Sequence, residues 1–192
     1  MEAAIDSEVP LSSTVKRIAI LYNLKHGISS AARDAEAEYD SIDTVNALRD
    51  VFERGGLTVL TLEADRQLPK KLTEARFDMA FNIAEGLSGR GREAQVPALL
   101  SLMGFRLTGS DETTLAVALN KSFTNRLLST YGVRVPRSAV LAPDTAFRAP
   151  RLSYPVLVKP NCEGSSKGIA ETAVADNLKA LRALAEKNFS LY

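Results

Sequence analysis

The sequence has very few of the residues on which many structural and catalytic sites depend: one cysteine and one histidine among 192 residues. With Cys162 as its only cysteine, the chain cannot form an internal disulfide, which fits a reducing, cytosolic setting. With His26 as its only histidine, it cannot build a histidine metal site, and a histidine-based catalytic triad would depend on this one loop residue.

An excess of charge and a long apolar run are also missing. The chain has 24 basic and 23 acidic side chains, which leaves a net charge of +1 at pH 7. This balance argues against a basic nucleic-acid-binding surface and against a polybasic membrane face. No apolar run approaches the roughly 20 residues of a membrane span, and residues 1–10 lack the basic and apolar regions of a signal peptide. We therefore expect a soluble, cytoplasmic protein.

What is present is an alternation of strand-like and helix-like segments. The apolar pattern predicts strands over residues 15–22, 57–62, 77–83 and 105–108, with a later extended segment over 135–141. It predicts helices over residues 42–52, 69–75, 93–103, 111–131 (one helix or two abutting ones) and 176–187. Asp40 or Ser41 could cap the first helix, and Asp176 the last. This order is typical of an α/β fold with a parallel sheet and right-handed crossovers.

The expected ligand side of such a sheet lies off the carboxyl ends of its strands. No G-x-G-x-x-G follows the first strand, which argues against a dinucleotide-binding dehydrogenase. The polar, glycine-rich segment 82–93 leaves the sheet at this edge and carries Glu85, Arg90, Arg92 and Glu93. An arginine can hold the carboxylate of a zwitterionic substrate, and a glutamate can hold its ammonium group. The alternative is a solvated loop with incidental charges.

A second candidate site follows residues 156–158, which read as a short buried strand with Lys159 at its end and Pro160 stopping it. The next six residues form a polar loop: Glu163, Gly164, Ser165, Ser166, Lys167 and Gly168. Two glycines allow positive φ, so that successive N–H groups can turn toward an anion, and the hydroxyls and lysines add donors. With a second extended piece from Ile169, this strand–loop–strand unit is suited to holding phosphate. A plain hairpin loop is the alternative, and the P-loop order G-x-x-x-x-G-K-[ST] is absent.

The run Y-P-V-L-V-K-P…E-G-S-S-K-G-I resembles the nucleotide-binding strand pair of ATP-grasp ligases, in particular the D-alanine–D-alanine ligase group. The resemblance extends upstream through residues 102–136, L-M-G-F-R-L-T-G-S-D-E to Y-G-V-R-V-P. It implies a parallel-sheet, Rossmann-like pre-ATP-grasp domain followed by an incomplete α+β ATP-grasp subdomain. The expected division is a disordered lead-in at 1–14, a substrate domain at 15–133 and a partial nucleotide-binding subdomain at 134–192.

The resemblance also implies a function. In that group ATP, with Mg²⁺, phosphorylates a substrate carboxylate, and the amine of a second amino acid attacks the acyl phosphate, a step that serves cell-wall peptidoglycan. Lys121 and Lys159 match the group's nucleotide-contacting lysines, and residues 163–168 match the mobile loop over the phosphates. Ser165 matches the loop serine that is also near the first substrate, and so is the candidate catalytic residue. The implied partners are ATP and a small amino-acid-like substrate, and homodimers are common in the group.

The chain departs from the group's pattern in four places. Residues 82–86, N-I-A-E-G, replace the usual histidine-glycine loop after the third strand. After the first strand it has Y-N-L-K-H-G instead of a glycine-serine-glutamate signature, with glutamates only at Glu36 and Glu38, so another amino acid or a small peptide stays open as substrate. Lys167 stands where the peptide-type ligases usually have a small apolar residue. The group's magnesium ligands and phosphoryl-stabilising arginine would lie beyond Tyr192. We therefore expect this polypeptide alone to be an inactive, weakly nucleotide-binding part of a ligase, or alternatively a non-catalytic small-molecule-binding or regulatory module.

Overall fold

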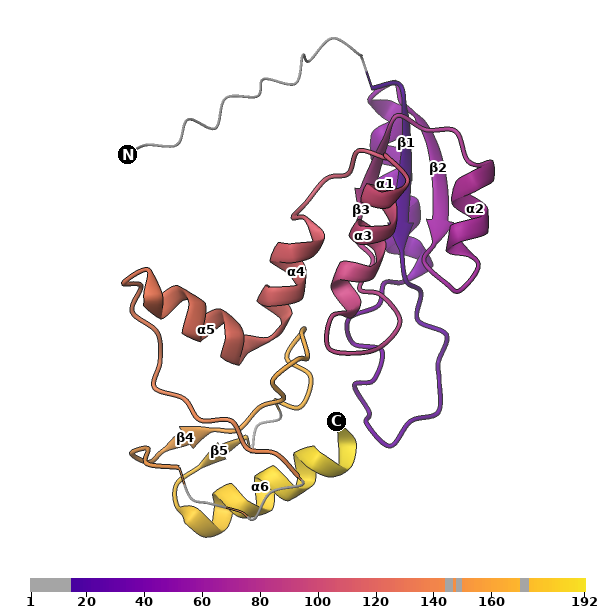
Figure 1. The fold of residues 1–192 in the computed structure, drawn as a ribbon. Coiled ribbons are helices and arrows are strands. Elements are labelled where there is room, and N and C mark those ends of the chain that lie inside the picture. Colours follow the sequence, from indigo (N-terminus) through magenta and orange to yellow (C-terminus); the bar gives the residue numbers. More distant parts are fainter. Residues whose placement is uncertain (1–14, 144–146, 148–149, 170–172) are drawn as a thin grey trace, which may run out of the picture.

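The computed structural model describes residues 15–143, 147, 150–169 and 173–192. The predicted disordered lead-in, 1–14, lies outside the described residues, as does most of the extended piece expected just after Ile169. The described chain forms two layered parts that are joined by a pair of helices (Figure 1). Among the described residues, no helix has the length and apolar character needed to cross a membrane.

The first part contains a three-stranded parallel sheet of β1 (Arg17–Tyr22), β2 (Thr58–Glu63) and β3 (Met79–Asn82). The strand order is β2-β1-β3, with β1 in the centre, which confirms the predicted α/β class. The fourth predicted strand, 105–108, is wrong as a full strand. This segment forms one isolated bridge, between Ala80 and Leu107. It is confined between the turns at Gly104 and Gly109, and its partner, β3, has only four residues.

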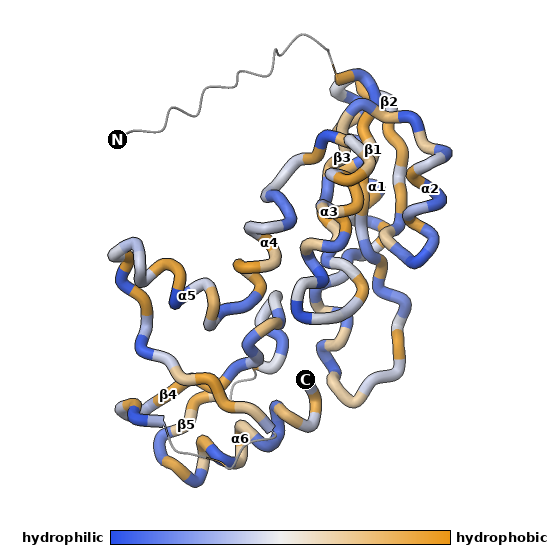
Figure 2. The backbone as a smooth tube through the Cα atoms, viewed as in Figure 1, coloured by the Kyte–Doolittle hydropathy of each residue, from blue (hydrophilic) through white to orange (hydrophobic). Residues whose placement is uncertain are grey.

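Helices cover both faces of the sheet, as Figure 1 shows. Ile20 and Tyr22 point to one face and pack with Val45 of the helix on that side, whereas Ala19 and Leu21 point to the opposite face. This alternation is the period of two that a strand buried on both faces must show. Apolar residues accordingly concentrate in the three strands (Figure 2). The helices of this part are α1 (Ile42–Arg54), α2 (Leu68–Glu74), the 3₁₀ turn η1 (Arg92–Ala94) and α3 (Gln95–Leu102).

Capping side chains fix where several helices begin. Ser41 caps α1, its hydroxyl accepting a hydrogen bond from the Thr44 N–H at 3.3 Å, which decides between the two predicted caps. The predicted helix over 111–131 divides at Asn120 into α4 (Glu112–Leu119) and α5 (Lys121–Thr130). Asn120 leaves the helical conformation, with ψ at 95°, and caps α5 by accepting from the Phe123 N–H.

The second part is small and mixed. β4 (Val156–Leu157) pairs antiparallel with β5 (Val174–Ala175), and α6 (Leu178–Leu191) follows. The predicted cap of this helix, Asp176, is wrong, because Asn177 takes the position and accepts from the Ala180 N–H at 3.0 Å. Residues 135–141 form no strand. A parallel sheet followed by a small α+β unit is the predicted fold class, and it is confirmed.

The packing of α3 generates a stability prediction. Leu100 is fully buried in the core between the sheet and α3, whereas Leu102 on the same helix is 85% exposed. We expect Leu100→Ala to lower the free energy of unfolding by about 2–5 kcal/mol, because it removes buried contacts and leaves a cavity. The matched control, Leu102→Ala, should cost less than about 0.5 kcal/mol. Urea denaturation measures both, and equal losses would contradict the described packing.

Candidate functional site

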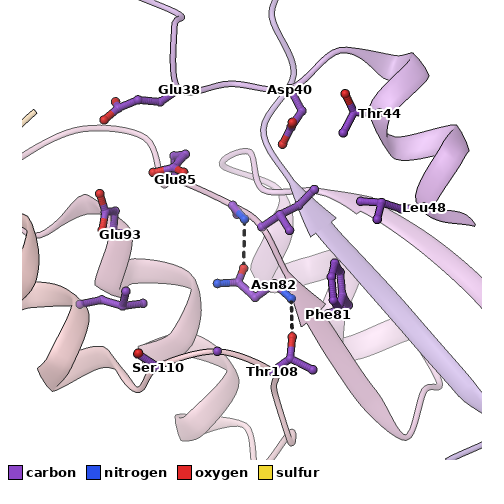
Figure 3. Close-up of a pocket in the computed structure, with 14 residues that line it drawn as sticks. Glu38, Asp40, Thr44, Leu48, Phe81, Asn82, Glu85, Glu93, Thr108 and Ser110 are labelled. Carbon is purple, nitrogen blue, oxygen red and sulfur yellow. Dashed lines mark hydrogen bonds between the residues drawn. The ribbon is translucent and has the colours of Figure 1, made fainter. Parts of the chain in front are cut away.

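A cavity of about 450 Å³ opens at the carboxyl end of β3, on the side where ligands of parallel sheets bind (Figure 3). Residues from three successive segments surround it, and Figure 3 shows carboxylates gathered along one side and the apolar side chains of Leu48 and Phe81 at the other. The lining residues are Glu38, Asp40, Thr44, Leu48, Phe81, Asn82, Ile83, Ala84, Glu85, Glu93, Thr108, Gly109, Ser110 and Leu115.

The polar side of the cavity is strongly acidic. Burial, followed by repulsion from the carboxylates of Glu93 and Glu38, raises the pKa of Glu85 to about 7. Burial also raises the pKa of Glu93 and that of Asp40. Within the described part of the chain, no donor reaches the carboxylates of Glu85 and Glu93 within hydrogen-bond distance. A positively charged ligand group would therefore be attracted to this wall of the cavity.

Asn23, at the end of β1, holds the Glu85 loop in place. Its side chain is buried, accepts hydrogen bonds from the N–H groups of Glu85 and Gly86 at 2.9 and 3.0 Å, and donates to the Ala64 carbonyl. Gly86 has a φ of +80°, and an added Cβ would lie 2.0 Å from the Arg92 carbonyl oxygen. Only glycine fits this close approach, so the sequence fixes the path of the loop beside the cavity.

A buried ion pair lies at the inner edge of the cavity. One terminal nitrogen of Arg92 donates to both carboxylate oxygens of Glu38 at 2.6 and 2.7 Å. The side chains are 7% and 3% exposed, respectively. The same nitrogen also donates to Glu163 at 3.3 Å, and the other terminal nitrogen of Arg92 donates to the Cys162 carbonyl at 2.8 Å. Arg92 therefore connects the first part of the chain to the polar loop of the second.

The polar loop, residues 163–168, rests against Glu38. The Gly164 N–H donates to Glu38 at 2.6 Å, and the Lys167 ammonium lies 2.5 Å from Glu163 and 3.4 Å from Glu38. A Cβ on Gly164 would lie 2.5 Å from the Glu38 carboxylate oxygen, so glycine is what allows this contact. Ser165 and Ser166 occupy the exposed tip with φ values of 43° and 60°. The prediction that the two glycines supply the positive φ values is therefore confirmed for Gly168 and wrong for Gly164, and Ser165 and Ser166 adopt such values instead.

Two lysines flank the base of the loop. The Lys121 ammonium donates to the Glu163 carbonyl, and the Lys121 N–H donates to the Asn161 carbonyl at 3.1 Å. Burial, followed by the positive charge of Lys159, lowers the pKa of Lys121. The two ammonium groups thus repel each other. The side chain of Lys159 is exposed to solvent. Exposed and half-buried cations beside a turn of N–H groups can attract a phosphate chain.

The structure thus places the sequence-predicted residues in different settings. Glu85 lines the cavity, whereas Arg92 is committed to the chain's own oxygen atoms and Arg90 is exposed, outside the cavity wall. Lys121, Lys159 and the loop 163–168 come together beside it. Sequence reasoning missed Glu38, which lines the cavity and binds the loop. The only signal was that Glu36 and Glu38 are the sole glutamates between the first predicted strand and the first predicted helix.

Comparison with curated proteins finds D-alanine–D-alanine ligases. The chain is 36% identical over 159 residues to the ligase of Cupriavidus necator, covering 81% of this chain and 47% of that protein. It is 32% identical over 130 residues to the ligase of Sphingopyxis alaskensis, covering 68% and 42%. The chain thus spans about half the length of the curated relatives it matches. No protein-family model matches the sequence.

Comparison with solved structures supports the same fold. A D-alanine–D-alanine ligase from Bacillus anthracis complexed with ATP matches with a TM-score of 0.70 and 18% identity, covering 91% of this chain and 55% of that one. A D-Ala:D-Ser ligase from Enterococcus faecalis matches with a TM-score of 0.62 and 18% identity, covering 93% and 60%. At this level of identity the matches establish the fold of the described parts.

The ion pair at the edge of the cavity generates a stability prediction. Glu38→Ala would leave the buried guanidinium of Arg92 without its main partner, which we expect to lower the free energy of unfolding by about 3–5 kcal/mol. The control is Glu186→Ala, which breaks a pair with Arg182 in which both side chains are more than 60% exposed, and which should cost at most about 0.5 kcal/mol. Chemical denaturation checks both, and a small effect at Glu38 would rule out a strong buried pair.

The acidic wall generates a pH prediction. The native state keeps the Glu85 proton up to a pKa of about 7, whereas the unfolded chain loses it near 4.5. Because the native state binds more protons in this window, the contribution of Glu85 to stability falls as pH rises from about 4.5 to about 7. Glu85→Gln should remove this trend, so the variant gains stability relative to the unmodified protein across the window. Carboxyl NMR titration and urea denaturation at several pH values test it, and parallel curves would contradict it.

Proposed function

Because this chain belongs to the D-alanine–D-alanine ligase-like ATP-grasp family, we propose that it provides the substrate-binding part, and the beginning of the nucleotide-binding part, of an ATP-dependent carboxylate–amine ligase. The observation that carries the proposal is the contact of the polar loop 163–168 with Glu38, which lines the cavity. A phosphate-binding loop and a substrate cavity that share one wall are what transfer of a phosphoryl group to a bound carboxylate requires. We assign residues 15–133 to the substrate part and 134–192 to the nucleotide part.

The donor set around the loop suits ATP. When bound, ATP would supply the phosphoryl group that activates a substrate carboxylate. Lys121 and Lys159 would neutralise phosphate charge at the base of the loop, and the Ser165 and Ser166 N–H and hydroxyl groups at its exposed tip would donate to phosphate oxygens. Ser165 is the proposed catalytic residue, because it would lie near both the phosphates and the first substrate. Closure of the loop over the cavity would exclude water that otherwise hydrolyses an acyl phosphate.

The cavity suits an amino-acid-like substrate. Glu85 and Glu93 offer carboxylates without a hydrogen-bond donor in the described part of the chain, and these can hold an ammonium group. Of the two arginines predicted from the sequence, Arg92 positions the loop, and we propose Arg90, which is exposed and outside the cavity wall, as the candidate for a substrate carboxylate. The relatives' substrate, D-alanine, is the first amino acid to test, and the altered exit of β1 leaves other amino acids or a small peptide open.

The remaining parts of the proposal follow from ligase chemistry. Mg²⁺ would accompany ATP, but we assign it no ligands here. The carboxylates of Glu38, Glu85 and Glu93 lie within 4.8 Å of one another, yet Glu38 is already bonded to Arg92 and Lys167. A cytoplasmic location, where ATP is available, and a homodimer of the kind common in the group complete the proposal. Its product would serve cell-wall peptidoglycan.

A second candidate function is a non-catalytic amino-acid-binding module. One observation favours it: every residue that lines the cavity lies between Glu38 and Leu115, so the cavity is formed within the proposed substrate part, 15–133. Such a module would bind an amino acid without ATP hydrolysis, and the assay below separates the two functions.

The test is an ATP-dependent ligation assay on the protein that carries this sequence. We expect phosphate release with ATP, Mg²⁺ and D-alanine or another amino acid, and a dipeptide product seen by mass spectrometry. Lys159→Ala should weaken nucleotide binding by about tenfold or more, because it removes a charge-assisted contact worth roughly 1.5–3 kcal/mol. Lys179→Ala, on the exposed face of α6, is the control and should change nothing.

Two outcomes would contradict the ligase proposal. Amino-acid binding that is unaffected by ATP, with no phosphate released by the protein, would favour the binding module. If Lys159→Ala and Lys179→Ala bind the nucleotide equally well, Lys159 does not contact the nucleotide. The neighbouring loop would then no longer be assigned to the nucleotide site.

A further inference from the structure

The loop that we assign to phosphate has much of its donor capacity already taken. The Gly164 N–H donates to Glu38 at 2.6 Å, and the Gly168 N–H donates to Asp34 at 2.8 Å. The Lys167 ammonium is shared between Glu163 and Glu38 at 2.5 and 3.4 Å. Among the described residues, the loop N–H groups of Glu163, Ser165 and Ser166 have no acceptor, and the two serines form the exposed tip.

Two of these acceptors come from far away in the sequence. Asp34 and Glu38 lie in the segment that follows β1, more than 120 residues before the loop. Their carboxylate oxygens are the same kind of acceptor as phosphate oxygens: anionic, compact and able to accept from successive N–H groups. They contact the first and last N–H groups of the turn, on either side of its tip.

The Asp34 contact is itself reinforced. Although partial burial works in the opposite direction, hydrogen bonds from Tyr192 and Gly168 and the charge of Lys167 lower the pKa of Asp34. The Tyr192 hydroxyl donates to one carboxylate oxygen while the Gly168 N–H donates to the other. The end of α6, the loop and the segment after β1 therefore meet at a single carboxylate.

We propose that Asp34 and Glu38 act as internal stand-ins for phosphate, which hold the loop 163–168 against the substrate part until a nucleoside triphosphate displaces them. This inference rests on the proposed function, because it takes the loop to be a phosphate site. The exposed tip at Ser165 and Ser166 receives the first phosphate oxygens, and the Gly168 N–H then exchanges its carboxylate partner for phosphate. Nucleotide binding thereby competes with the contact between the two parts of the chain.

The test compares two substitutions of Asp34 in the intact protein. Asp34→Ala removes both the charge and the acceptor of the Gly168 N–H, whereas Asp34→Asn removes the charge and keeps an acceptor. We expect ATP, titrated with and without Mg²⁺ by calorimetry or NMR, to bind Asp34→Ala about three- to tenfold more tightly than Asp34→Asn, since roughly one hydrogen bond no longer competes. Amide hydrogen exchange at Gly168 should also become faster in Asp34→Ala.

The outcomes separate this inference from the proposed function. If the unmodified protein binds ATP and the two variants bind it equally well, the acceptor of the Gly168 N–H does not compete with phosphate, and the stand-in role is overturned. If no form binds ATP or inorganic tripolyphosphate at millimolar concentration, the loop is not a phosphate site, and the proposed function falls together with the inference. Asp34→Ser, whose shorter side chain does not reach Gly168, replaces the alanine variant if that variant does not fold.

Discussion

The buried ion pair between Glu38 and Arg92 is the interaction on which the arrangement of the site depends. It joins the segment after β1 to the loop after β3, and through the Cys162 carbonyl and the Gly164 N–H it joins both to the second part of the chain. Removing two charges from water is costly, and only good geometry with further hydrogen bonds offsets that cost. Here Glu38 accepts from a guanidinium, an N–H and an ammonium group, so its bonding capacity is well used.

This pairing also explains why the cavity is acidic. Arg92 and Lys167 are bonded to Glu38 and Glu163, and among the described residues no cation forms an ion pair with Glu85 or Glu93. Their raised pKa values follow from burial without such a partner. The charges near the cavity therefore form two groups. The ion pairs of Arg92 and Lys167 with the glutamates hold the loop, whereas the carboxylates of Glu85 and Glu93 can attract a ligand's ammonium group.

Local patterns in the sequence predict much of the fold but only part of the site. The continuous apolar run of β1 and the helical spacing of Val45 and Leu48 predict a buried strand and an amphipathic helix of an α/β fold, because burial imposes those patterns directly. The cap at Asn177 instead of Asp176 and the single bridge at Leu107 depend on small differences in backbone geometry that no periodicity records. The role of Glu38 depends on partners 54 and 126 residues away, so it is visible only once the two parts are folded together.

Lys167 shows how a departure from a family pattern can be understood from its neighbours. The buried network contains the carboxylates of Glu38 and Glu163 and the cations of Arg92 and Lys167, so its charges balance. A small apolar residue at this position would leave two carboxylates facing one guanidinium beside the loop that we propose as the phosphate site. Since an unpaired buried charge is costly and repels an anion, the glutamates and Lys167 form one unit. The presence of these residues in this chain is therefore best explained together: Lys167 balances the charge of the glutamates that anchor the loop, as the proposed binding of an anion requires.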